Sequence, residues 1–130
     1  MKKIVIIGAN DFQNQLILKA KEMGFETHVF AWQDGSIGER TADHFYPVSI
    51  VETDAILEKC REIQPDAVTT IASDLANITV SKVAAGLGLP GNTPECIEIS
   101  TNKYAMRSAF KKAGLPTPAF YKVDHVTDEL

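Results

Sequence analysis

The stretch KIVIIGANDF, residues 3–12, joins an apolar run to a glycine and a helix start. The run Ile4–Ile7 is apolar at every position without alternation, which is typical of a strand buried on both faces of a parallel sheet. Gly8 lets the backbone turn where the strand ends, and Asn10 or Asp11 can cap the helix that follows. The segment therefore predicts the opening strand, turn and helix of an α/β fold.

The same alternation of strand and helix continues along the chain. Further strands are expected over residues 27–32, 44–48, 67–71 and 119–123, with a polar loop over residues 33–43. Helices are expected to begin at the capping residues Asp11, Thr53, Asp74, Thr93 and Thr101. Helical spacing places apolar residues on inward faces, namely Phe12, Leu16, Ala20 and Met23 in the first helix, Ile56, Leu57, Cys60 and Ile63 in the second, and Leu75, Val80, Val83, Ala84 and Leu87 in the third.

Short links between these units predict a doubly wound, Rossmann-like parallel sheet with helices on both faces. This domain is expected to cover residues 1–92. In a strand order of 3-2-1-4, the loops after the first and fourth strands would be neighbours where the winding reverses. Residues 93–130 are predicted to be connector helices and the first strand of a further domain.

The overall charge and the cysteine content limit the classes of function. The net charge is −4 and the pI about 5.3, and the longest basic clusters are lysine pairs, so no nucleic-acid partner is expected. The first apolar run is too short for a secretory signal, and no window reaches the roughly 18 residues of a membrane span. The chain is therefore expected to be cytoplasmic, without a membrane partner, and Cys60 and Cys96 to be reduced thiols.

Two loops are the first candidates for a ligand site, because open α/β sheets bind ligands beyond the carboxyl ends of their strands. The sequence places small and polar residues there, together with one aromatic residue: Gly8, Asn10, Asp11 and Phe12 after the first strand, and Ser73 and Asp74 after the fourth. Gly8 allows a ligand to approach the backbone, and the amides at the following helix start favour an anion. The two aspartates instead suit an amine or a hydroxyl. The alternative is that Asp11 and Asp74 only cap helices.

A nicotinamide dinucleotide site is a rival interpretation. It needs Gly-x-Gly-x-x-Gly after the first strand and an acidic residue at the end of the second. Here Gly8 is the only one of these glycines present, Asn10 would crowd a pyrophosphate, and Gln13 would hold helix and strand apart. Asp34 lies two residues beyond the expected end of the second strand. The sequence therefore disfavours an oxidoreductase-type dinucleotide domain.

Lys103 lies in the first turn of the helix that follows Thr101. A cation at this end opposes the helix dipole unless an anion lies nearby. Arg107 follows one turn later on the same helical face and adds a second cation. The pair favours a phosphate partner, and the alternative is that Lys103 is a solvated surface lysine.

Other common site patterns are missing from the sequence. His28, His44 and His125 are far apart and have no partners at ligand spacing, so no metal site is expected. Neither a serine-hydrolase elbow nor a phosphate-binding P-loop motif is present, and no catalytic residue is predicted. Trp32 is interpreted as core or rim packing.

Several segments, taken in order, resemble the N-terminal part of ATP-grasp ligases, and most closely proteins like the carbamoyl phosphate synthetase large subunit. They are residues 3–8 (KIVIIG), 42–48 (ADHFYPV), 69–76 (TTIASDLA) with 86–92 (GLGLPGN), and 101–107 (TNKYAMR) with 113–118 (AGLPTP). The resemblance covers the whole chain. The first segment is shared by many Rossmann-like domains, whereas the last two are fairly specific as a pair.

The resemblance implies a pre-ATP-grasp domain that contributes to the substrate pocket while two further lobes clamp ATP. It implies that Lys103 contacts ATP phosphate and that the loops at Gly8–Phe12 and Ser73–Asp74 line the acceptor-substrate side. In this family ATP phosphorylates a carboxylate, and an amine then displaces phosphate, with Mg²⁺ held by acidic side chains. The family's metal ligands, flap and adenine pocket lie beyond the matched part, so the 130-residue chain is expected to be inactive alone and to hold no cofactor tightly.

The sequence thus predicts the substrate-side domain of an ATP-dependent carboxylate–amine ligase. Such a protein needs ATP, Mg²⁺, a small carboxylate or amine substrate, and the missing ATP-grasp domain in cis or in trans. The alternative is a free-standing module that binds a small anion or nucleotide, or a subunit that partners a separate ATP-clamp chain. Apolar surface around residues 115–123 is expected to support a homodimer.

Overall fold

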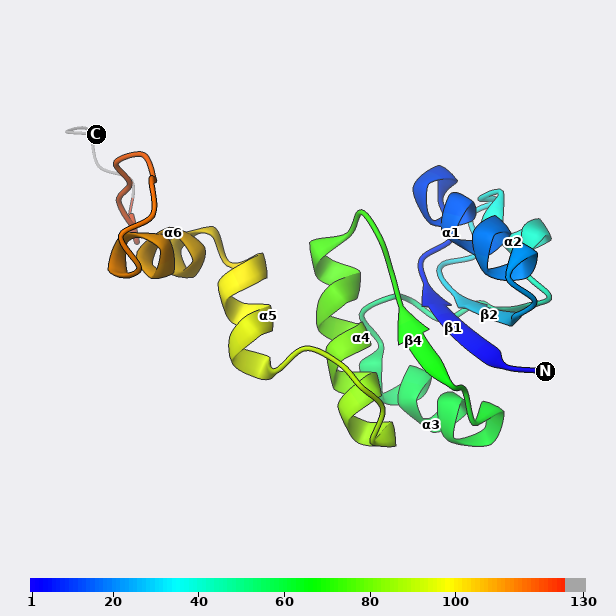
Figure 1. Cartoon of the computed structure of the whole chain (residues 1–130). Coiled ribbons are helices and arrows are strands. Elements are labelled where there is room, and N and C mark those ends of the chain that lie inside the picture. Colours follow the sequence, from blue (N-terminus) through cyan, green and yellow to red (C-terminus); the bar gives the residue numbers. More distant parts are fainter. Residues whose placement is uncertain (126–130) are drawn as a thin grey trace. The chain divides into compact units, whose positions relative to one another are not determined.

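The computed structural model describes residues 1–125 and divides the chain into two compact units, Met1–Thr93 and Pro94–Leu130 (Figure 1). The first unit holds a sheet covered by helices on both faces, and the second holds two helices. No helix within residues 1–125 combines the length and the apolar character needed to cross a membrane.

The sheet has four strands, all parallel, in the order β3-β2-β1-β4. They are β1 (Lys3–Ile7), β2 (Glu26–Phe30), β3 (His44–Tyr46) and β4 (Ala67–Thr69). The doubly wound α/β class predicted from the sequence is confirmed, and the strand order is the one in which the loops after the first and fourth strands are neighbours. The second, third and fourth strands end two residues earlier than predicted, and the residues beyond them form loops at the carboxyl edge of the sheet.

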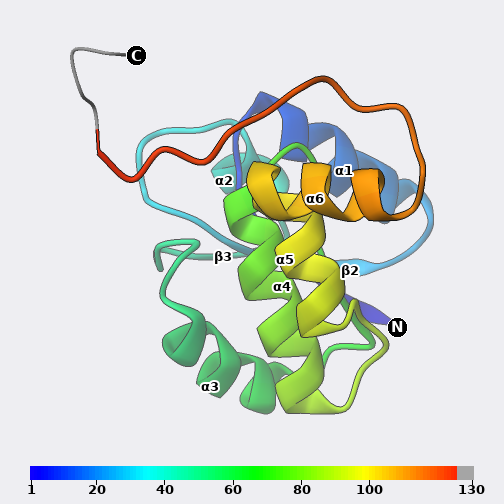
Figure 2. The same cartoon turned by 90° about the vertical axis from the view of Figure 1, so that its left-hand side faces the viewer.

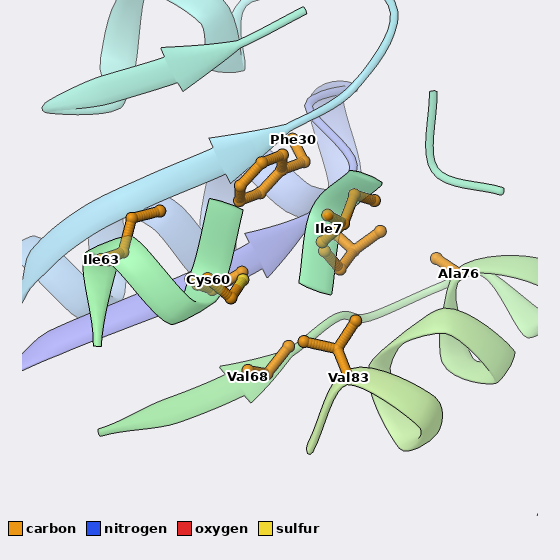
Figure 3. Packing of buried hydrophobic residues seen from close by; sticks show 9 residues of the cluster. Ile7, Phe30, Cys60, Ile63, Val68, Ala76 and Val83 are labelled. Carbon is orange, nitrogen blue, oxygen red and sulfur yellow. The ribbon is translucent and has the colours of Figure 1, made fainter. Parts of the chain in front are cut away.

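Helices α3 (Thr53–Ile63) and α4 (Asp74–Leu87) lie side by side on one face of the sheet (Figure 2). A hydrophobic core lies between these two helices and the sheet. It consists of buried side chains from β1, β2, β4 and both helices, among them Ile7, Phe30, Cys60, Ile63, Val68, Ala76 and Val83 (Figure 3). The predicted inward face of α3 is confirmed, because its buried residues recur at helical spacing.

Two details of α4 differ from the prediction. Ser73, not Asp74, is the N-cap, and its Oγ accepts a hydrogen bond from the Ala76 amide at 3.1 Å. Asp74 is the first helical residue, where a carboxylate still favours the helix dipole. The start of the helix also leaves Leu75 half exposed, so Ala76 and Thr79 take the inward positions at this end.

Helix α1 (Asp11–Glu22) covers the other face of the sheet, and the short α2 (Gly38–Thr41) packs against α1. The predicted inward stripe of α1 is confirmed at Leu16 and Ala20 and was wrong at its ends, because Phe12 is 67% exposed and Met23 is 64% exposed. The buried stripe runs instead through Gln13, Asn14, Ile17 and Ala20. Buried polar side chains usually have hydrogen-bond partners, and Gln13 has them on both ends of its amide, whereas Oδ1 of Asn14 has none among the described residues. Helix α2 is a short turn inside the segment predicted to be a loop.

The second unit contains α5 (Pro94–Thr101) and α6 (Lys103–Lys112), which pack against each other. Asn102, not Thr101, caps α6, and its side-chain oxygen accepts from the amides of Tyr104 and Ala105 at 3.0 and 3.1 Å. The strand predicted over residues 119–123 is not formed, because the described part of this unit offers no strand to pair with it. Residues 126–130 of the predicted connector lie outside the described residues.

Candidate functional site

A cavity of about 180 Å³ lies at the carboxyl edge of the sheet, where the loops after β1, β2 and β4 meet. Its lining comes from these loops, from the first turns of α1 and α4, and from the segment before α3: Gly8, Ala9, Asn10, Gln13, Ala31, Trp32, Asp34, Ser36, Ile50, Ser73 and Ala76. This is the edge at which parallel α/β sheets bind their ligands, beside the point where strand order reverses.

Gly8 forms the turn directly after β1. Its φ of +105° is in the region that favours glycine, and its amide donates to the Phe30 carbonyl at 2.8 Å. A Cβ atom at this position would lie 2.9 Å from Cδ of Gln13. The glycine is therefore needed both for the backbone angle and for the close approach of the buried Gln13 side chain.

Asn10 and Gln13 form a reciprocal capping box at the start of α1. The Asn10 side-chain oxygen accepts from the amides of Phe12 at 2.9 Å and Gln13 at 3.3 Å, and Gln13 Oε1 accepts from the Asn10 amide at 3.2 Å. These hydrogen bonds occupy the helix-start amides that were predicted to bind an anion. The cap therefore weakens the case for a phosphate at this helix end.

Gln13 also ties the first loop to the fourth. Its Nε2 donates to the Ile71 carbonyl at 2.6 Å, and the Thr70 hydroxyl donates to the Ile7 carbonyl at 2.7 Å. Ala72, next in the chain, has a φ of +56°, which is unusual for a residue with a side chain. The two loops are thus held together across the switch point, as the strand order predicts.

The loop after β2 forms a further wall of the cavity, and this wall was not predicted from the sequence. Glu39 Oε1 accepts from the amides of Asp34 at 2.9 Å and Gly35 at 2.7 Å, so the loop is closed on itself. The Asp34 carboxylate accepts from the hydroxyl and the amide of Ser36, and these bonds lower the pKa of Asp34. A charged carboxylate therefore stands at the cavity rim. Gly35 and Gly38 were the sequence signal that could have indicated a tightly folded loop here.

The predicted loop residues separate into three groups. Gly8, Asn10 and Ser73 line the cavity. Asp74 lines a neighbouring open hollow, which it shares with Ser73. Asp11 and Phe12 line neither of these two hollows, and both are exposed.

Lys103 and Arg107 lie in the second unit. Lys103 is the first residue of α6 and is exposed, and Arg107 is four residues later on the same helical face, as the sequence predicts. Asn102 occupies the amides at the start of this helix, so an anion near Lys103 would be met chiefly by side-chain charge.

The expectation that the histidines lie apart was wrong for two of them. His28 and His44 are register partners on neighbouring strands, and their rings stack with centroids 4.5 Å apart. Glu26 lies beside both rings. The parallel pairing of β2 with β3 makes neighbours of two histidines that are sixteen positions apart in the sequence. Residue spacing within one helix or strand cannot reveal such a contact.

No family model matches the chain. Among curated proteins it aligns over 121 residues with a formate-dependent phosphoribosylglycinamide formyltransferase from Prochlorococcus marinus, at 22% identity, over 92% of this chain and 31% of that protein. The solved structure of N5-carboxyaminoimidazole ribonucleotide synthetase from Thermotoga maritima matches with a TM-score of 0.78 and 26% identity, over 96% of this chain and 34% of that one. An ADP complex of a synthetase with the same name matches with a TM-score of 0.69 and 25% identity, over 91% and 30% of the two chains.

These proteins are ligases of the ATP-grasp type, and this chain aligns with their N-terminal part. The resemblance to the N-terminal domain of ATP-grasp ligases is therefore confirmed. The chain spans about a third of the length of the curated relative it matches. None of the three proteins is a carbamoyl phosphate synthetase, so that finer resemblance stays a prediction.

Proposed function

We propose that the chain is the substrate-side domain of an ATP-dependent ligase that activates a carboxylate as an acyl phosphate and joins it to an amine. One observation carries the proposal: a cavity with polar groups from three loops lies at the switch point of a sheet that aligns with the N-terminal part of ATP-grasp ligases. ATP and Mg²⁺ are the cofactors of the complete enzyme, and the part that clamps them acts with this chain in cis or in trans.

The lining suggests how the cavity would hold an acceptor. The Asp34 carboxylate lines the cavity and accepts from Ser36, which lowers its pKa, and it can accept further hydrogen bonds from an amine or a hydroxyl of the substrate. Ser73 adds a hydroxyl, although its oxygen also caps α4. The Asn10 oxygen is used by the cap of α1, which leaves its NH₂ group as the donor toward a ligand.

The predicted aspartates have a smaller part in this proposal. Asp34 takes the role of the carboxylate that faces the amine, because it lines the cavity and Asp11 does not. Asp74, in the neighbouring hollow, is suited to a second portion of a longer substrate.

Lys103 is proposed to contact ATP phosphate, with Arg107 as a second cation on the same face of α6. Cationic side chains of this kind can stabilise the negative charge of the transferred phosphoryl group. This chain on its own is proposed to be catalytically inactive, since the residues that hold adenine and Mg²⁺ belong to the rest of the enzyme.

The test begins with the intact mass of the native polypeptide that contains this chain. ATP-dependent phosphate release is then measured for that polypeptide with a panel of small carboxylates and amines. Lys103→Ala should raise the KM for ATP about tenfold, the equivalent of one charge-assisted hydrogen bond. Lys112→Ala, at the other end of the same helix, is the control and should leave the KM unchanged.

The acceptor side is tested in the same assay. Asp34→Asn should raise the KM for the amine about tenfold and leave the KM for ATP unchanged. Asp54→Asn, an exposed carboxylate on α3, is the matched control. An unchanged amine KM in Asp34→Asn would overturn the assignment of the cavity, and phosphate release that no carboxylate stimulates would overturn the ligase itself.

A further inference from the structure

A cluster of three metal-ligating side chains lies on the sheet, away from the cavity. Glu26 and His28 are two residues apart on β2 and therefore point to the same face, and His44 is the register partner of His28 on β3. His28 Nε2 lies 2.8 Å from Glu26 Oε1, and His44 Nε2 lies 3.3 Å from the same oxygen. One ligand atom from each residue falls within 4.8 Å of the others. We propose that Glu26, His28 and His44 bind a divalent transition-metal ion of the Zn²⁺ class.

The buried member of the cluster is already oriented for this task. His28 is 4% exposed, and its Nδ1 lies 3.0 Å from the Tyr46 hydroxyl. Metal-binding histidines usually have such a partner on the second ring nitrogen, which fixes the tautomer and the ring plane. A hydroxyl both donates and accepts, so Tyr46 can accept from Nδ1–H when Nε2 carries the metal. The Tyr46 ring is itself held by stacking on Phe30, with centroids 4.6 Å apart.

The charged groups around the cluster include two lysines. Lys3 Nζ donates to the Ile63 carbonyl at 3.0 Å, and Lys59 Nζ donates to Glu62 at 2.6 Å, so both side chains are held by other partners. The Glu26 carboxylate supplies the negative charge that a divalent ion requires.

The exposed member provides access. The His44 side chain is half exposed, so an ion can enter from solvent and a water molecule can complete the coordination. The two rings are nearly parallel, at 16°, and both lone pairs can reach one ion only if a ring turns. His44 has the room to turn, whereas His28 is fixed. Two imidazoles and one carboxylate are a donor set that suits zinc, cobalt or nickel.

The position of the cluster indicates a structural effect of the bound ion. β3 is an edge strand of three residues that pairs only with β2 within the described sheet. An ion held by Glu26, His28 and His44 would link the two strands through their side chains. It would lie toward the amino end of β2, whereas the cavity lies beyond the carboxyl end. The metal is therefore expected to raise thermal stability without entering the ligase reaction.

The test uses untagged protein of residues 1–130 and Co²⁺, whose visible absorption reports imidazole coordination, with Zn²⁺ as competitor. Wild-type protein should bind one Co²⁺ per chain, lose the absorption when Zn²⁺ is added, and show a higher Tm with Zn²⁺. His44→Ala and Glu26→Gln should each weaken binding at least tenfold and abolish the Tm increase. Tyr46→Phe should weaken it about tenfold through the lost partner of His28.

His125→Ala is the matched control, because it removes a histidine from outside the cluster and should change neither measurement. Circular dichroism checks that each variant is folded, and His44→Ala removes a half-exposed ring that the core does not need. Absence of stoichiometric Co²⁺ binding in the folded wild type would overturn the proposal. It would also fail if His44→Ala and Glu26→Gln bound as tightly as wild type. In either case the cluster would be a carboxylate that only hydrogen-bonds two imidazoles.

Discussion

Gly38 rests directly on the backbone of Ala9: its amide donates to the Ala9 carbonyl at 2.9 Å, and a Cβ at Gly38 would lie 2.6 Å from that oxygen. The contact fastens the loop after β2 to the loop after β1, and both loops line the cavity. A clash with backbone atoms cannot be relieved by a rotamer change, so only glycine fits here without moving one of the loops.

Gly38→Ala is therefore expected to destabilise the protein by about 1–3 kcal/mol, the usual cost of overpacking. Urea unfolding of the two proteins measures the difference. Gly35→Ala is an informative comparison, because Gly35 has a φ of +85° and a methyl group added there would meet no atoms within 4 Å, so it tests backbone strain without a clash. A Gly38→Ala protein as stable as wild type would show that the two loops are not fastened at this contact.

Gln13 offers a second test of how the loops are joined. Gln13→Ala removes the donor to the Ile71 carbonyl and the acceptor for the Asn10 amide in a buried place, and should cost about 2–3 kcal/mol of unfolding free energy. Gln15→Ala, an exposed glutamine on the same helix, should change it by less than about 0.5 kcal/mol. Equal effects of the two variants would contradict the role given to Gln13.

Gln13 also shows which parts of the fold can be predicted from the sequence and which cannot. The parallel, doubly wound sheet was predictable, because the run Ile4–Ile7 and the strand–helix alternation report directly on such a sheet. The buried face of α1 was not, since Gln13 is inward only because its partners on other segments satisfy it. Hydropathy alone favoured Phe12, which the structure leaves exposed.

Only part of the cavity lining comes from the two loops that the sequence singled out. Gly8, Asn10 and Ser73 of those loops line the cavity, and their part in binding stays a prediction, whereas Asp34 and Ser36 reach it through a loop whose shape depends on Glu39 and Gly38. Those contacts have no local sequence pattern. The same applies to the pairing of His28 with His44, which arises from strand register.

Asp43 should make stability depend on pH in the acid range. The hydrogen bond from Lys21, which is the largest cause, and those from Thr27 lower the pKa of Asp43 from 3.8 to about 2, against the opposing effect of burial. A lowered folded-state pKa stabilises the protein above pH 3.8, and this contribution is lost as the pH falls from 3.8 toward 2. The shift corresponds to about 2 kcal/mol, reduced by solvent screening to about 1 kcal/mol at this partly exposed side chain.

Asp43→Asn should therefore lower the free energy of unfolding by about 1 kcal/mol at pH 7, and the difference from wild type should vanish near pH 2. Urea unfolding at a series of pH values measures it. Asp54→Asn serves as an exposed control and should give a smaller difference. A deficit of Asp43→Asn that stayed constant from pH 7 to pH 2 would show that charge is not its source.

The two cysteines should differ sharply in reactivity. Burial in the core between α3 and α4 raises the pKa of Cys60 to about 12, so almost no thiolate forms at pH 8, whereas Cys96 is exposed. A disulfide-exchange reagent should modify one thiol per folded chain and two after unfolding in urea. Cys96→Ser should leave no rapidly reacting thiol, and fast labelling in that variant would mean that the core opens readily.

Trp32 stands at the rim of the cavity, 68% exposed, and it is the single tryptophan of the sequence. Its indole therefore provides a built-in optical probe of this one place in the molecule. A ligand that enters beside Asp34 and Ser36 would remove water from the ring and move the emission to shorter wavelength, while events elsewhere in the chain would leave the spectrum almost unchanged. Candidate substrates can thus be screened on unmodified protein, before any partner chain or coupled assay is in hand.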